Sequence, residues 1–136
     1  MMAGFITYLW IAMGSALGGV ARYACSSLLA RAFGETFPVG TLLVNVVGSF
    51  VIGFFATATG PDGRVLASPD ARLFVTVGLC GGYTTFSSFS WQTLVLVQEG
   101  EVVRAGVNVG ASVGLCLASV WLGYIAAAAL SRVRPA

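Results

Sequence analysis

Apolar residues form four long stretches in this chain, separated by short polar turns. The stretches cover approximately residues 5–29, 39–59, 73–97 and 102–130. Each is long enough for a membrane-spanning helix, which needs about 20 mostly apolar residues. The pattern therefore predicts an all-α integral membrane protein, with a single four-helix transmembrane domain over residues 1–136.

The third stretch contains a polar interruption. Residues 81–90 read Gly-Gly-Tyr-Thr-Thr-Phe-Ser-Ser-Phe-Ser. Gly81 and Gly82 favour unwinding, and the hydroxyl pairs that follow can bond the backbone locally. Lipid offers no hydrogen bonds to an unwound backbone, so such a break persists only beside protein or water. We therefore predict a broken third helix and a functional site at the break.

Composition supports a membrane protein. The chain is 57% hydrophobic and 9% charged, which is too apolar and too charge-poor for a soluble domain of 136 residues. The N-terminus lacks the basic region of a secretory signal, so we expect the first stretch to remain as a permanent span. The net charge of +2 includes no basic patch, so we expect membrane lipid and no nucleic acid as a partner.

Charged residues give little indication of orientation or of metal binding. The arginines are divided between the two predicted sides of the membrane with only a modest bias, so insertion in both orientations is conceivable. All five carboxylates lie in turns or at helix ends, and the chain has no histidine. Proton-coupled pumps normally carry an intramembrane carboxylate or histidine. We therefore expect passive conduction, and neither acid–base catalysis nor metal-dependent hydrolysis.

Polar side chains recur one helical turn apart inside two of the stretches. Thr41 and Asn45 share a face of the second, and Asn108 and Ser112 share a face of the fourth. Such faces either line an ion path or bond neighbouring helices together, and the pattern leaves both interpretations open. Arg22 is the one charge well inside a span. It either snorkels to the membrane surface or faces a water-filled vestibule that attracts anions.

Small and aromatic residues add two further hypotheses. Glycines spaced by four residues allow helices to approach closely, within one bundle or between subunits. These are Gly14 and Gly18, Gly78 and Gly82, and Gly106, Gly110 and Gly114. Four short helices hardly enclose a hydrated path alone, which favours an oligomer. Phe86 and Phe89 share a face that would ordinarily contact lipid or the core, but their electropositive ring edges also suit an anion path.

Three motifs in order resemble the bacterial Fluc, or CrcB, family of fluoride channels. They are Gly18-Gly19-x-x-Arg22-Tyr23, Gly40-Thr41-Leu42-x-x-Asn45-x-x-Gly48 and Gly78-x-x-Gly81-Gly82-x-Thr84-Thr85-Phe86-Ser87-Ser88-Phe89. The resemblance covers nearly the whole chain. It implies an antiparallel, dual-topology homodimer in the bacterial cytoplasmic (inner) membrane, with two fluoride pathways and a structural sodium ion at the dimer interface. The implied activity is passive, fluoride-selective export from the cytoplasm, which confers fluoride resistance.

The resemblance also implies a role for each site residue. Backbone carbonyls of Gly81 and Thr84 from both subunits would hold the sodium ion. Pore residues would be Phe86, Phe89, Asn45, Thr41, Ser87 and Ser112, and Arg22 would lie in the vestibule. Two positions depart from the family pattern. Ser88 stands where many relatives have threonine, and Asn108 stands in the outer polar track where a tyrosine is expected.

Two other classes of protein remain to be distinguished. A small dual-topology multidrug exporter also uses four helices, but it needs a buried carboxylate in its first span. The first span here has none, and Arg22 has the wrong sign for a cation carrier. A structural membrane protein would use its polar faces only to hold helices together. Asn45→Leu would then reduce stability without a selective loss of fluoride flux.

Overall fold

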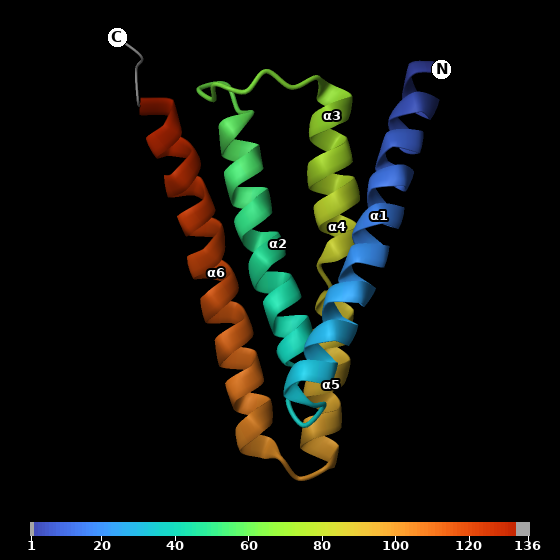
Figure 1. The fold of residues 1–136 in the computed structure, drawn as a ribbon, viewed down its shortest axis with the longest axis vertical. Coiled ribbons are helices and arrows are strands. Elements are labelled where there is room, and N and C mark those ends of the chain that lie inside the picture. The colour runs from blue at the N-terminus through green and yellow to red at the C-terminus, as the bar shows by residue number, and fades with distance from the viewer. Residues whose placement is uncertain (1, 133–136) are drawn as a thin grey trace.

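The computed structural model describes residues 2–132, and every regular element within them is a helix. Three helices are long and uninterrupted: α1 (Met2–Phe33), α2 (Val39–Ala58) and α6 (Val102–Arg132). Between α2 and α6 lie α3 (Pro69–Leu73), the π-helix η1 (Phe74–Cys80), α4 (Gly81–Tyr83) and α5 (Phe86–Gln98). These four short elements follow one another as an interrupted rod beside α1 and α2 (Figure 1).

The three long helices confirm an all-α membrane architecture. Each is long and apolar enough to cross a bilayer: Gly4–Phe33, Val39–Ala58 and Val102–Ser131. The α1 helix continues past the predicted end at residue 29 and stops at Gly34, whose φ of 78° suits a glycine after a helix C-terminus. Both turns between long elements, at 34–38 and 99–101, lie at one end of the molecule. The 59–68 loop lies at the other end with Met2 and Arg132 (Figure 1).

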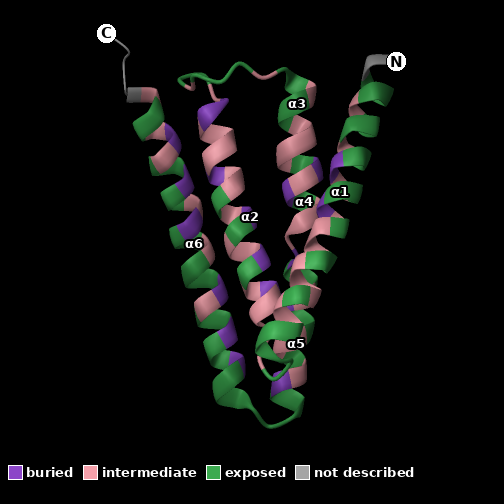
Figure 2. Ribbon diagram, viewed as in Figure 1, coloured by how far each residue is buried: buried purple, intermediate pink, exposed green. Residues whose placement is uncertain are grey.

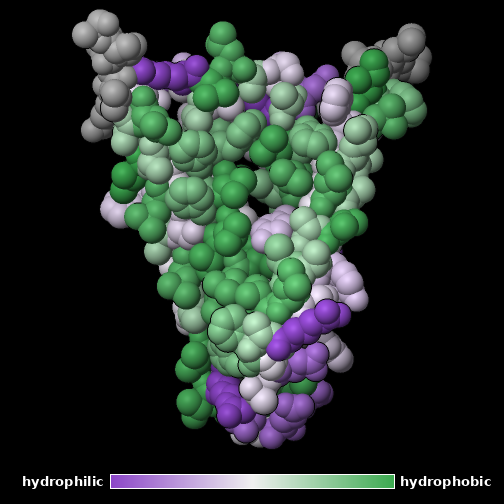
Figure 3. Space-filling view, in the orientation of Figure 1, coloured by the Kyte–Doolittle hydropathy of each residue, from purple (hydrophilic) through white to green (hydrophobic). Residues whose placement is uncertain are grey.

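The surface of the chain is more apolar and more extensive than that of a soluble protein. A broad hydrophobic region separates two more polar ends on the face shown in Figure 3. The accessible surface is 8765 Å², whereas a globular monomer of 14.0 kDa exposes about 6,700 Å². Few positions are buried (Figure 2), and the buried ones include polar side chains. They are Thr41, Thr59, Thr85, Asn108, Ser112 and Ser119.

Glycines allow α1 to pack against the π-helix and α4 at backbone contact. A Cβ added at Gly82 would lie 2.5 Å from the Ser15 carbonyl oxygen, and one added at Gly78 would lie 2.9 Å from that of Ile11. This part of the glycine pattern therefore serves packing within the chain. The three evenly spaced glycines in the first half of α6 behave differently, since a Cβ at Gly106, Gly110 or Gly114 would meet no atom of another element within 4 Å.

The third predicted span is broken, but its glycines do not form the break. Gly81 has helical angles (φ −64°, ψ −37°). The chain leaves the helix at Thr84 (φ −81°, ψ 159°) and Thr85 (φ −154°, ψ 109°). The prediction that Gly81 and Gly82 unwind is therefore wrong. A glycine is needed at position 82 because α1 packs directly against it. The break occurs at Thr85, whose backbone forms hydrogen bonds with a side chain of α2 and not with its own helix.

Candidate functional site

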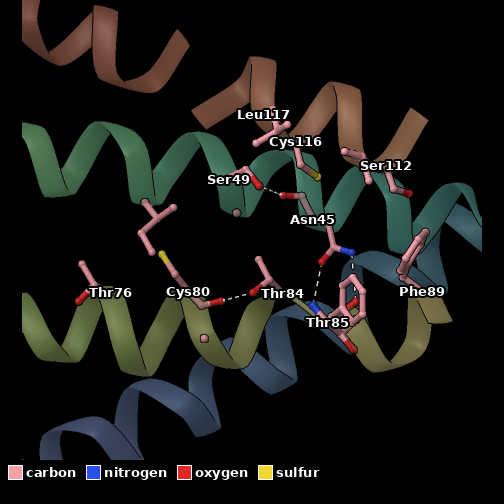
Figure 4. A pocket seen from close by; sticks show the side chains of 15 residues that line it. Asn45, Ser49, Thr76, Cys80, Thr84, Thr85, Phe89, Ser112, Cys116 and Leu117 are labelled. Atoms are coloured by element: carbon pink, nitrogen blue, oxygen red, sulfur yellow. Dashed lines mark hydrogen bonds between the residues drawn. The ribbon is translucent and has the colours of Figure 1, made fainter. Parts of the chain in front are cut away.

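A cavity of about 460 Å³ lies beside the break, between α2, the interrupted rod and α6 (Figure 4). Six of the predicted site residues line it: Asn45, Gly81, Thr84, Phe86, Phe89 and Ser112. Its wall also includes Ser49, Cys80, Thr85 and Cys116. The structure thus brings together side chains from three separate segments that the sequence pattern singled out one by one.

The side chain of Asn45 holds the break in its extended form. Its Oδ1 accepts a hydrogen bond from the Thr85 amide at 2.8 Å, and its Nδ2 donates to the Thr85 carbonyl at 3.1 Å (Figure 4). A buried backbone group without a partner costs about 1–3 kcal/mol. Asn45 satisfies both the amide and the carbonyl of Thr85, which joins α2 to the broken segment. Asn45 also lines the cavity. Thr85 occupies only one of the two N–H groups of Nδ2.

Hydroxyl groups complete the start of α5. The Thr85 hydroxyl accepts from the Ser88 amide at 3.2 Å, which caps the helix, and lies 3.0 Å from the Ser88 hydroxyl. Ser88 thus contacts Thr85 through both its backbone amide and its hydroxyl. Ser87 does not line the cavity. Its hydroxyl lies 3.2 Å from that of Thr85.

The break also frees backbone carbonyls. In an unbroken helix the carbonyl of Gly81 would accept from the Thr85 amide, and that of Thr84 from the Ser88 amide. Here the Thr85 amide donates to Asn45 and the Ser88 amide to the Thr85 hydroxyl. Within residues 2–132 no group of three histidine, cysteine or acidic side chains could hold a metal. Oxygen atoms of these carbonyls are therefore the donors that fit a hard cation such as sodium.

The two phenylalanines lie in contact but in different surroundings. Their ring centroids are 5.2 Å apart with an interplanar angle of 51°. Phe89 is 8% exposed and Phe86 is 77% exposed. Both line the cavity with Asn45 and Ser112, so the two aromatic rings share this space with polar groups of α2 and α6.

A second, more polar cavity of about 1030 Å³ opens at the end of the molecule that carries the two turns. Charged residues from both turns line it: Arg31, Glu35, Glu99, Glu101 and Arg104. Thr41 lines this second cavity, while Asn45, one turn later on α2, lines the first. The polar face of α2 therefore runs from one cavity to the other.

Arg22 lines neither cavity, although its neighbours Tyr23 and Ser26 line the second one. Among residues 2–132, the Arg22 side chain makes no hydrogen bond or ion pair. Because α1 runs on to Phe33, Arg22 lies about three turns from the helix end, further than a helix ending near Leu29 predicts.

Two contributors to these cavities were missed by sequence reasoning. Thr85 is the backbone partner of Asn45, and nothing in the local sequence distinguishes it from Thr84. Gln92 lines the second cavity, and its Oε1 is the one buried side-chain polar atom without a hydrogen-bond partner in the described part of the chain. Its position three residues after Phe89, on the same helix face, is the signal that could have indicated it.

The predicted polar face of α6 divides into two parts. Ser112 lines the first cavity. Asn108, one turn earlier, is only 1% exposed, lines neither cavity, and donates a hydrogen bond to Thr93 at 2.9 Å. Ser112 thus lines a cavity, whereas Asn108 forms a bond between helices.

Long apolar helices, with a cavity between them that polar side chains partly line, define a multi-pass, all-α membrane protein. The model of the family described as "CrcB-like protein, Camphor Resistance (CrcB)" matches residues 9–124. The chain belongs to this family, as the three motifs predict.

Several relatives are similar over nearly their full length. The "Fluoride-specific ion channel FluC" of Opitutus terrae is 59% identical over 127 residues, which cover 93% of this chain and 96% of that protein. The protein of the same name from Rhodospirillum rubrum is 56% identical over 127 residues, or 93% and 98% of the two chains. That of Methylocella silvestris is 54% identical over 129 residues, or 95% and 98%.

Proposed function

We propose that this chain is the subunit of a fluoride-selective channel that exports fluoride passively from the bacterial cytoplasm. The observation that carries the proposal is the cavity beside the break, which an asparagine, a serine and two phenylalanines line together. These groups suit a small anion, which needs hydrogen-bond donors in place of its hydration shell. The names of the relatives supply the identity of the ion.

Passive conduction is sufficient for this task. Hydrogen fluoride crosses lipid and dissociates in the more neutral cytoplasm, so the trapped anion needs only a conductive exit down its electrochemical gradient. A proton-coupled transporter normally carries a titratable group inside the membrane. The carboxylates of this chain lie in turns or near helix ends instead.

We further propose that two copies form an antiparallel homodimer in the inner membrane, in which Pro69–Gln98 makes the fourth crossing despite its break. Three features support a second copy: the large exposed apolar surface, the open glycine face of α6 and the exposure of Phe86. The modest arginine bias suits insertion in both orientations. Each subunit would then contribute one polar path, which gives two pores per dimer.

The proposed path runs along α2. An anion would enter the charged second cavity, pass Thr41 and reach Asn45, Ser112 and the phenylalanines in the first. Ser87, next to this cavity, would contribute through the hydroxyl cluster around Thr85. Arg22 would act at longer range by raising the local anion concentration.

A structural sodium ion would bind to the carbonyls of Gly81 and Thr84. One chain offers two such oxygens, whereas hard cations take more oxygen ligands than that. The exposure of Gly81 suits a site completed by the same carbonyls of the second copy. The ion would bind the carbonyl oxygens that the break leaves without amide partners, and it would link the two subunits.

The test of function is flux from liposomes. Purified protein is reconstituted in vesicles with a potassium gradient, and anion release is followed after valinomycin is added. We expect rapid fluoride release and negligible chloride release. Comparable release of the two anions would refute selectivity, and release of neither would refute the channel.

The sodium site is tested by dimer stability. Replacing sodium with a large organic cation should lower the thermal midpoint of dimer dissociation in detergent, because the freed carbonyls would lose their ligand. Size-exclusion chromatography over a temperature series measures the change. Identical midpoints in the two salts would rule out the metal.

A further inference from the structure

Asn108 and Val44 are the largest fully buried side chains of the described residues, and Asn108 is the polar one of the pair. Its Nδ2 donates to the Thr93 hydroxyl at 2.9 Å, across the interface between α6 and α5. The Thr93 hydroxyl in turn donates to the carbonyl of Phe89 at 2.7 Å. A hydrogen-bonded chain therefore leads from α6 to the backbone of a residue in the first cavity.

The break makes this contact important for the placement of α5. Because Thr84 and Thr85 are extended, α5 is not a continuation of α4, and helical hydrogen bonds across the break cannot fix its position. Side-chain contacts must do so. Asn45 holds α5 at Thr85, and Asn108 holds it at Thr93.

Phe89 lies midway between these two contacts. Thr85, Phe89 and Thr93 follow one another at intervals of four residues, so they lie on one face of the segment, each one turn from the next. One asparagine from α2 and one from α6 therefore hold the two ends of the two-turn segment that carries Phe89.

We propose that Asn108 is a positioning residue for the pore, which acts through Thr93 to fix the backbone and ring of Phe89. The proposal rests on the channel function above, because it assigns Phe89 to the anion path. It gives Asn108 a role without contact to the ion, since Asn108 lines neither cavity.

The chain offers a matched control on the same helix. Ser119 is 8% exposed and donates to the Val46 carbonyl at 2.7 Å, which joins α6 to α2. Ser119 lines neither cavity, and its partner is not on α5. Ser119→Ala removes an interhelical bond of α6 that does not involve α5, so it reports the general effect of loosening this helix.

The experiment measures fluoride flux and the environment of Phe89 in the same proteins. The variants are Asn108→Leu, Thr93→Val, Thr93→Ser, Ser119→Ala and the Asn108→Leu/Thr93→Val double variant. Each is prepared as the purified dimer with 4-fluorophenylalanine at position 89, and a second sample carries the label at position 54 on α2. The ¹⁹F resonance reports the ring environment whether or not fluoride is conducted.

We expect Asn108→Leu to reduce fluoride flux at least about tenfold and to shift or broaden the resonance of position 89 alone. Thr93→Val removes the same hydrogen bond by deleting its acceptor, so it should reduce flux and change the resonance in the same way. If Asn108→Leu does not assemble, Thr93→Val alone tests the proposal. The double variant should lose no more than Thr93→Val alone, because the two changes delete one shared bond. Thr93→Ser and Ser119→Ala should stay within about threefold of the parent.

Two results would overturn the proposal. One is an unchanged resonance of position 89 in Asn108→Leu and Thr93→Val, whatever their flux. The other is an equal effect of Ser119→Ala on flux and on that resonance. If the parent protein conducts no fluoride, the channel function fails, while the resonance of position 89 still decides whether Asn108 positions the ring.

Discussion

Asn45→Leu should lower fluoride release from liposomes at least about a hundredfold. Leucine is similar in size but leaves the amide and the carbonyl of Thr85 without their partners. Each unpaired buried group costs about 1–3 kcal/mol, and about 1.4 kcal/mol corresponds to a tenfold change. The extended form of the break should therefore become a minor conformation, and the cavity loses its amide donor.

Thr57→Val is the matched control for this prediction. Thr57 lies on the same helix, lines neither cavity and donates only to the Gly53 carbonyl within α2. Both variants are compared as dimers by size-exclusion chromatography before reconstitution. A well-folded Asn45→Leu dimer with normal fluoride flux would show that Asn45 serves helix packing and does not belong to the anion path.

Phe86→Ile and Phe89→Ile should each reduce fluoride flux at least about tenfold and leave the dimer assembled. Isoleucine keeps the site apolar but removes the aromatic ring edge, which carries the positive end of the ring quadrupole. The two variants should differ in stability. Phe89 is buried, so its replacement should lower the free energy of unfolding by about 1–3 kcal/mol, whereas the exposed Phe86 should matter less within one subunit.

Phe50→Ile separates this effect from a general loss of aromatic packing. Phe50 stacks on Phe54 along α2 with centroids 6.2 Å apart, and it lines neither cavity. Flux and thermal stability are measured for all three variants. Normal flux in both Phe86→Ile and Phe89→Ile would remove the phenylalanines from the mechanism.

The exporter alternative loses support from the position of the acidic residues. A small multidrug exporter needs a carboxylate inside its first span, and residues 5–29 contain none. Asp70, the acidic residue that does contact α1, lies in the first turn of α3 and accepts a hydrogen bond from Thr7 near the helix start. This contact joins the ends of two helices.

The length of each apolar stretch was sufficient to predict the long helices, because a helix must be apolar over its whole length to cross the hydrocarbon core. Asn45, Ser112 and the two phenylalanines were identifiable for a related reason: a polar or paired aromatic residue stands out within an apolar segment. The structure placed them in one cavity. That convergence depends on how the helices pack, which periodicity alone does not specify.

The position of the break and the role of Asn108 required tertiary information. Glycine propensity indicated Gly81 and Gly82, but both are helical, and Gly82 packs closely against α1. The chain leaves the helix at Thr84 and Thr85 instead, where Asn45 bonds the backbone of Thr85. Asn108 looked equivalent to Ser112 because the two share a helix face. Only the position of α5 shows that one meets Thr93 and the other meets the cavity.

The hydrogen bonds between Asn45 and Thr85 bear on how this protein is made. Forty residues separate the two partners, so the third segment leaves the ribosome after α2 without its own means of satisfying the broken backbone. It enters the bilayer either as a continuous helix or already paired with α2. Membrane insertion of this segment should thus depend on the presence of α2. The break at Thr84 and Thr85 should form late in biogenesis, when the helices pack together.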